Sequence, residues 1–141
     1  MKETDVKRDL KDENPRVMIE SIENALSSGI PDTIAMFDEA CVFLEVKVAR
    51  NSGAIPKVQL RSSQIMFFRK AHQVKFNGAF ILVVHKGNLM LYNGVVQKEQ
   101  ITVIKNGNGW FLIELTQTPL FCKPYTGSSF RELMDKLLPQ G

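Results

Sequence analysis

The sequence predicts a single domain of the α/β class with a mixed central sheet. Apolar residues between Met18 and Leu26 recur at helical spacing. The run Ala79–His85 is almost continuously apolar, as expected for a strand that is covered on both faces. Glycines and asparagines at 105–109, between two short apolar runs, predict a β-hairpin. Helical and strand patterns alternate along the chain, and no internal repeat or second domain is visible.

The first helix is expected to begin at Asn14-Pro15, because asparagine is a common N-cap and proline is favoured in the first turn. Gly29 and Pro31 should end it. Residues 1–13 mix charges of both signs and are expected to be weakly ordered. The other predicted elements are strands at 33–37, 41–48 and 57–61, a helix at 62–72 with Ser62 as N-cap, strands at 79–85, 89–92, 101–104 and 110–115, and a helix at 128–138.

The composition is that of an ordinary globular domain, with 44% hydrophobic and 23% charged residues in a chain of 141. No apolar run is long enough for a transmembrane helix, and residues 1–15 lack the apolar segment of a secretory signal. We therefore expect a cytoplasmic protein with no membrane partner. Cys41 and Cys122 are isolated, which predicts reduced thiols. The net charge of +3 permits a nucleic-acid partner without requiring one.

Two charged residues interrupt an otherwise apolar strand. Glu45 and Lys47 are separated by one residue, so their side chains share one face of the strand, with Cα atoms about 7 Å apart. Burying a carboxylate and an ammonium is costly unless the two are paired or bound to a metal. The strand alone leaves two interpretations open, a structural salt bridge and part of a chemical site.

A third charged residue, Asp32, stands at the start of the preceding strand. Pro31 fixes its own φ, so Asp32 enters the sheet in a defined direction. If the two strands form a hairpin, the start of one lies near the end of the other, and Asp32 approaches Glu45 or Lys47. An ordinary turn aspartate is the alternative interpretation.

The predicted first helix carries two glutamates. At 100° per residue, Glu23 flanks the apolar stripe whereas Glu20 faces solvent, so Glu23 is the candidate for the site. Two or three carboxylates beside one lysine form an oxygen-rich site that suits Mg²⁺ or Mn²⁺. His72 and His85 have no cysteine or histidine at ligand spacing, so zinc is not expected.

Pro31-Asp32 followed by Glu45-Val46-Lys47 resembles the PD-(D/E)xK signature of restriction-endonuclease-like nucleases. A wider pattern over about residues 16–92 is similar to the VRR-NUC group and related phage-type nucleases; it consists of Ile22-Glu23-Asn24, Gly29-Ile30-Pro31-Asp32, Phe43-Leu44-Glu45-Val46-Lys47 and Gln64 opening a helix. The resemblance implies a restriction-endonuclease-like αβββαβ core, here with a C-terminal β-hairpin and helix. We thus expect one nuclease domain, with residues 14–94 as the catalytic core and 95–141 as an extension.

The resemblance also implies roles for the site residues. Asp32 and Glu45 would hold the metal, the Val46 carbonyl would be a third ligand, and Glu23 would support the metal directly or through water. Two further residues would act on the reaction itself. Lys47 would position the nucleophile, and Gln64 would lie near it or near the scissile phosphate.

Members of this group are DNA nucleases, and stand-alone versions resemble Holliday-junction resolvases that act as homodimers. The resemblance therefore implies a Mg²⁺-dependent DNA endonuclease that acts on branched DNA in repair or recombination. The candidate phosphate contacts are Arg50, Lys57, Arg61, Arg69 and Lys70. For Arg69 and Lys70, a solvated helix face is the alternative.

Two other functions stay open. A non-catalytic DNA-binding module is disfavoured because Asp32, Glu45 and Lys47 are all present. A sequence-specific restriction or homing nuclease is disfavoured because no separate base-reading domain is visible. For Trp110 and Phe111, packing in the core or in a dimer is preferred over stacking on bases.

Overall fold

The computed structural model describes residues 1–22, 29–104 and 107–138. Its centre is a six-stranded sheet in the order β1-β2-β3-β5-β6-β9, formed by Met18–Ser21, Thr33–Met36, Cys41–Ala49, Ala79–His85, Asn88–Asn93 and Phe121–Pro124. β3 and β5 pair in parallel, whereas the other neighbouring strands of this sheet pair antiparallel. The predicted α/β class with a mixed central sheet is confirmed.

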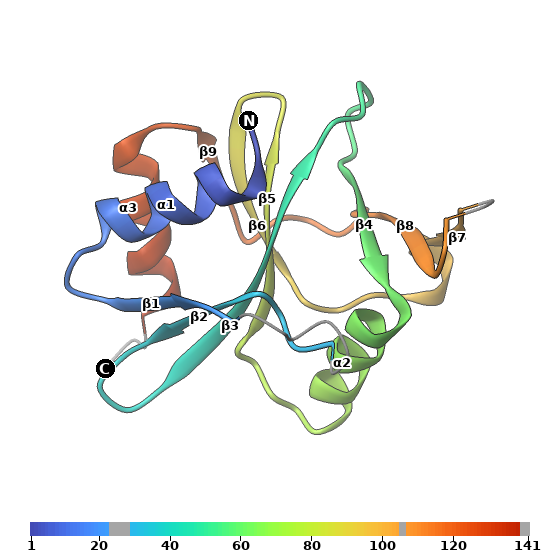
Figure 1. Ribbon diagram of the computed structural model, residues 1–141, viewed down its shortest axis with the longest axis horizontal. Coiled ribbons are helices and arrows are strands. Elements are labelled where there is room, and N and C mark those ends of the chain that lie inside the picture. The colour runs from blue at the N-terminus through green and yellow to red at the C-terminus, as the bar shows by residue number, and fades with distance from the viewer. Residues whose placement is uncertain (23–28, 105–106, 139–141) are drawn as a thin grey trace.

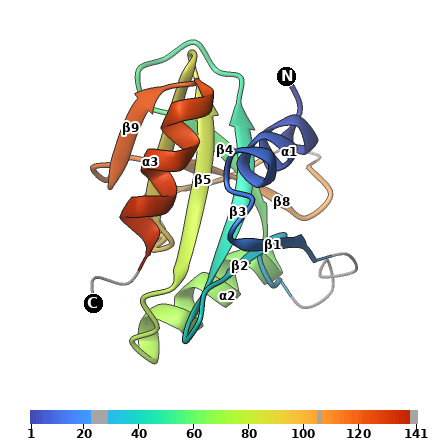
Figure 2. The ribbon, with the colours of Figure 1, turned by 90° about the vertical axis from the view of Figure 1, so that its left-hand side faces the viewer.

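Helices cover both faces of this sheet. α1 (Glu3–Glu13) and α3 (Gly127–Leu137) lie together on one side, and α2 (Ser62–Gln73) lies on the other (Figures 1 and 2). Beside α2 stands a second sheet in the order β4-β8-β7, formed by Lys57–Arg61, Trp110–Glu114 and Ile101–Val103, with a short 3₁₀ helix, Lys98–Gln100, before β7. Within the described ranges, no helix has the length and apolar character needed to span a membrane.

Strand β5 shows how the two sides of the sheet are filled. Leu82 and Val84 belong to the cluster under α1 and α3, whereas Ile81 and Val83 belong to the cluster under α2 and the second sheet. Successive side chains of a strand point to opposite faces, so a strand covered on both sides must be apolar throughout. Coverage on both faces explains the continuous apolar run from which this strand was predicted.

The N-terminal segment was wrongly predicted to be weakly ordered. Residues 3–13 form α1, and its Val6 and Leu10 are fully buried in the core. The helix is tied to α3 because Asn14 Nδ2 donates a hydrogen bond to the Phe130 carbonyl oxygen at 3.2 Å. The packed core of the fold therefore begins before residue 14, since α1 contributes to it.

The helix predicted after Asn14-Pro15 is also wrong where the structure describes it. Met18–Ser21 is strand β1, which pairs antiparallel with β2. Only Ile19 of this strand is buried, so pairing with β2 overrides a helical spacing that rested on few residues. With α1 in place of that helix, the chain reads α1-β1-β2-β3-β4-α2-β5, which is the αβββαβ order that the resemblance implies with β4 inserted before α2.

The remaining elements match the predicted positions with three differences. Strand β4 pairs with β8 in the second sheet and does not join the central one. Helix α2 is capped by Arg61, one residue before the predicted Ser62. Strand β9 was not predicted; it pairs with β6, and α3 packs against α1, so this part of the 95–141 region completes the core.

Candidate active site

The structure brings Asp32 and Glu45 together at the open end of the β2–β3 hairpin. Thr33 pairs with Leu44 in the antiparallel ladder, which places Asp32 opposite Glu45. The Asp32 backbone N–H donates to Glu45 Oε1 at 3.2 Å, and the Val46 backbone N–H donates to Asp32 Oδ1 at 3.1 Å. These two bonds fix the carboxylates relative to each other, and the approach expected from the hairpin is present.

Glu45 is almost completely buried, at 3% exposure, although its side chain ends in an ionisable carboxyl group. The pKa of Glu45 is raised from 4.5 to about 7, first by burial and then by the negative charge of Asp32, while Lys47, the hydrogen bond from the Asp32 N–H and Lys7 act in the opposite direction. Lys47 Nζ lies 3.6 Å from Glu45 Oε2, on the same strand face as predicted. Although Lys47 lies close to Glu45, the raised pKa of Glu45 means that an additional positive charge would stabilise the site at neutral pH.

Helix α1 supplies the second lysine of the site. Lys7 Nζ lies 3.1 Å from Asp32 Oδ2, and both side chains are about three-quarters buried. One turn earlier on the same helix, Glu3 lines a groove together with Lys47. Neither residue was identified from the sequence, because residues 1–13 were expected to be weakly ordered. Val6 and Leu10, four residues apart, were the available signal for a helix with a buried side.

Gln64 has a clear local role in the start of α2. Its side-chain oxygen Oε1 accepts a hydrogen bond from the Arg61 backbone N–H at 2.8 Å, and the residue is buried. This bond satisfies one of the free N–H groups at the helix start. The neighbouring Ser63 lies directly against Gly29, since a Cβ added to Gly29 would stand 2.0 Å from the Ser63 carbonyl oxygen. Gln64 is thus next to the segment that leads into Asp32.

The other predicted metal ligands differ in where they lie. Val46 donates its N–H toward Asp32, and because the N–H and C=O of one strand residue point to the same side, its carbonyl oxygen also faces this end of the hairpin. Glu23 lies outside the described residues. Glu20 is an exposed residue of β1, in agreement with its predicted solvent position. In the described part of the chain, no group of three or more Asp, Glu, His or Cys side chains lies close enough together to hold a metal ion, so the described candidate ligands are two carboxylates and the Val46 carbonyl.

The candidate DNA-binding residues separate into two groups. Arg50 and Lys57 line a groove of about 470 Å³ that begins at Lys47 and runs between β3 and the second sheet. Within it, Lys57 Nζ pairs with Glu114 Oε1 at 3.5 Å, and an Arg50 nitrogen donates to the Met1 carbonyl at 2.8 Å. Arg61 lies beside this groove, with its guanidinium carbon 4.6 Å from the centre of the Trp110 ring.

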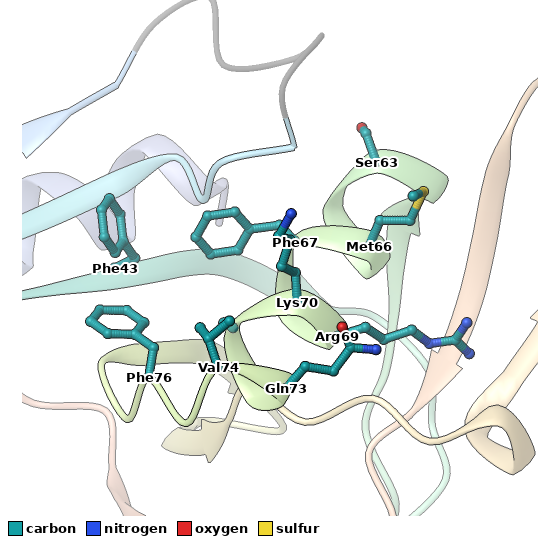
Figure 3. A pocket seen from close by; sticks show the side chains of 10 residues that line it. Phe43, Ser63, Met66, Phe67, Arg69, Lys70, Gln73, Val74 and Phe76 are labelled. Carbon is teal, nitrogen blue, oxygen red and sulfur yellow. The ribbon is translucent and has the colours of Figure 1, made fainter.

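Arg69 and Lys70 belong to a different surface. They line an apolar groove along α2 of about 890 Å³, which shares no lining residue with the groove at Lys47. Figure 3 shows Phe43, Phe67 and Phe76 gathered on one side of this groove, with the Arg69 side chain pointing away from them. The ring centres of Phe43 and Phe67 are 5.8 Å apart, in an edge-to-face contact. Aromatic packing dominates this surface.

Comparisons with known proteins give a similarity of structure but not of sequence. No protein-family model matches the chain, and no curated protein matches it. Among solved structures, the chain is similar to Hjc, a Holliday junction resolvase from Archaeoglobus fulgidus, with a TM-score of 0.49 and 14% sequence identity over 80% of this chain and 84% of that chain. The VRR-NUC resemblance is therefore not confirmed.

Proposed function

We propose that this chain is a divalent-metal-dependent endonuclease that hydrolyses phosphodiester bonds in DNA. The observation that carries the proposal is the convergence of Asp32, Glu45 and Lys47 at one end of a hairpin, where a groove with further basic residues begins. A salt bridge alone accounts for Glu45 and Lys47. It does not account for a second carboxylate placed against Glu45 at a site where burial already disfavours negative charge.

The donor set fits Mg²⁺ or Mn²⁺. Carboxylate and backbone carbonyl oxygens are hard ligands, and here they come from Asp32, Glu45 and Val46. We propose that Glu23 supports the ion directly or through water, and that Glu3 of α1, which lines the adjacent groove, acts through water. When bound, such an ion lowers the pKa of a coordinated water and offsets charge on a phosphate.

The remaining chemistry falls to residues of the chain. Lys47 is held at 3.6 Å from Glu45 and has three N–H donors, so it can orient a water molecule and donate to a phosphate oxygen as negative charge develops there. Gln64 stabilises the first turn of α2, and this turn lies against the segment leading to Asp32. Arg50 and Lys57 would contact the DNA backbone without reading sequence.

We further propose that the substrate is branched DNA and that the active form is a homodimer. One chain carries one site, and two coordinated strand cuts need two sites related by symmetry. The apolar groove on α2 supports a second copy as partner, because Met66, Val74 and Phe76 are exposed there. Sedimentation of the wild type against Phe76→Ser tests this point: a shift toward the monomer supports the dimer, and an unchanged monomer contradicts it.

The function is tested by incubating the protein with end-labelled linear duplex, single strand, flap and four-way junction in Mg²⁺, Mn²⁺ or EDTA. We expect metal-dependent cuts, with the junction preferred. Paired nicks across the junction alone would support the resolvase, whereas cuts at a fixed sequence in linear duplex would favour a sequence-specific enzyme. DNA binding without cleavage in any metal would favour a binding module and contradict the nuclease.

A further inference from the structure

The second sheet places an aromatic ring beside the lysine of the candidate site. Trp110 begins β8 and pairs with Arg61, the last residue of β4. The Lys47 Nζ atom lies 5.2 Å from the centre of the Trp110 ring, and the Arg61 guanidinium carbon lies 4.6 Å from it. Both distances are within the range of cation–π contacts. The ring thus connects a strand outside the αβββαβ core to the site on β3.

The contact with Trp110 limits the conformational freedom of the Lys47 side chain. A lysine has four rotatable bonds, so one carboxylate at 3.6 Å leaves much of its freedom. An aromatic face attracts the ammonium without accepting its N–H bonds as a carboxylate does. The ring therefore restricts Lys47 and leaves donors available for water and phosphate.

Arg61 contacts the Trp110 ring from the neighbouring strand β4. Its Nε atom is buried and has no hydrogen-bond partner in the described part of the chain, and its guanidinium carbon lies over the Trp110 ring. Trp110 and Lys47 also line the same groove of about 470 Å³. The ring is therefore part of the wall along which a DNA strand would reach Lys47.

We propose that Trp110 is a positioning residue that fixes the ammonium of Lys47 for cleavage and that Arg61 holds Trp110 in place. The proposal rests on the proposed nuclease function. It assigns to the β7–β8 hairpin a part in the active site, and it gives Arg61 a role other than the phosphate contact expected from the sequence.

The first test compares Trp110→Phe, which keeps a ring face, with Trp110→Leu, which removes it. With a four-way junction and Mg²⁺, we expect Trp110→Leu to lower kcat by about 10- to 100-fold with KM changed by less than about 2-fold, since misplacing a catalytic group by about 1 Å can reduce the rate to this extent. Trp110→Phe should recover most of the rate. The control is Phe111→Leu, which alters the next residue of β8 and should leave kcat near the wild-type value.

The second test needs neither DNA nor metal. Trp110 is the sole tryptophan of the chain, so intrinsic fluorescence reports directly on its ring. We expect Lys47→Met and Arg61→Met each to shift the emission maximum or change the intensity, whereas Lys70→Met, on the separate α2 groove, should not.

Two results would overturn the proposal. One is a folded Trp110→Leu variant that cuts as fast as the wild type. The other is unchanged fluorescence in Lys47→Met, which decides the matter even if Trp110→Leu fails to fold. A wild type that cuts no DNA while Lys47→Met still changes the fluorescence would instead contradict the nuclease function and leave the ring–lysine contact established.

Discussion

Lys7 of α1 and Asp32 at the start of β2 form an ion pair, with Nζ and Oδ2 3.1 Å apart. The pair joins the N-terminal helix to the candidate metal ligands and places a positive charge where two carboxylates, those of Asp32 and Glu45, face each other. Lys7 thus partly neutralises the site in the absence of a divalent ion. A metal that binds Asp32 must compete with this ammonium or displace it.

Replacing Lys7 by methionine should therefore tighten metal binding. The variant keeps the length and apolar stem of the side chain and removes only the charge. We expect a severalfold lower dissociation constant for Mn²⁺ by isothermal titration calorimetry at pH 8, and a larger rise in Tm on adding Mn²⁺. Lys11→Met, at an exposed position of the same helix, is the control and should bind Mn²⁺ with the dissociation constant of the wild type. Weaker metal binding by Lys7→Met would show that Lys7 supports the site instead of competing for it.

The sequence predicted the hairpin side of this site well, because the information there is local. Glu45 and Lys47 share a strand face by the geometry of any strand, and Pro31-Asp32 precedes a strand that pairs with it. The α1 side was missed for a physical reason. Val6 and Leu10 are the two fully buried apolar residues of α1, so most of its stabilisation comes from packing against α3 and the central sheet, and such tertiary packing is not visible in local spacing. The contact between Lys47 and Trp110 likewise depends on the pairing of β4 with β8, which no local pattern indicates.

Glu45→Gln should stabilise the protein at neutral and basic pH while removing activity. The pKa of Glu45 is raised from 4.5 to about 7, so between these values the folded state binds more protons than the unfolded state. Stability therefore falls as the pH rises through this window, by about 3 kcal/mol, and the loss is complete by about one pH unit above the folded pKa. A neutral glutamine can keep its Oε1 as acceptor for the Asp32 N–H and removes the cost of the buried charge.

The measurement is the free energy of unfolding by urea at pH 5, 6, 7 and 8. We expect the Glu45→Gln curve to lie above that of the wild type at pH 8 and to fall less between pH 5 and pH 7. Glu39→Gln, in the exposed turn between β2 and β3, serves as the control and should follow the wild type. A variant less stable than the wild type at pH 8 would mean that the pair with Lys47 outweighs burial.

Asp32→Ala and Lys47→Ala should abolish cleavage while leaving DNA binding largely intact. Neither residue is expected to carry most of the affinity for DNA, which on this proposal comes from basic residues along the groove such as Arg50 and Lys57. We expect a loss of at least about 1000-fold in single-turnover cleavage, comparable to the removal of a group that acts only in the transition state. Binding to an uncut junction in Ca²⁺, measured by gel shift, should change by less than about 3-fold. Cleavage by both variants at the wild-type rate would refute the site assignment.

Gly29→Ala tests whether the close approach of the Asp32 segment to α2 is needed for the site. Gly29 has a φ of +74°, and an added Cβ would stand 2.0 Å from the Ser63 carbonyl oxygen and 2.9 Å from the Gln64 backbone nitrogen. Both the left-handed conformation and the overlap with backbone atoms oppose a side chain there. Relief of the overlap must move either the first turn of α2 or the segment that leads into Asp32.

Gly87→Ala is the matched control, because Gly87 has a similar φ of +76° in the turn between β5 and β6 but no atom within 4 Å of an added Cβ. It should cost about 1 kcal/mol of stability from backbone strain alone and leave cleavage unchanged. Gly29→Ala should cost at least about 2 kcal/mol and lower the cleavage rate of the folded fraction by about 10-fold or more. Urea unfolding and single-turnover cleavage measure the two effects separately. Equal losses of stability in the two variants would show that the close approach of Gly29 to Ser63 does not affect the free energy of unfolding. An unchanged cleavage rate in folded Gly29→Ala would show that Asp32 keeps its place without it.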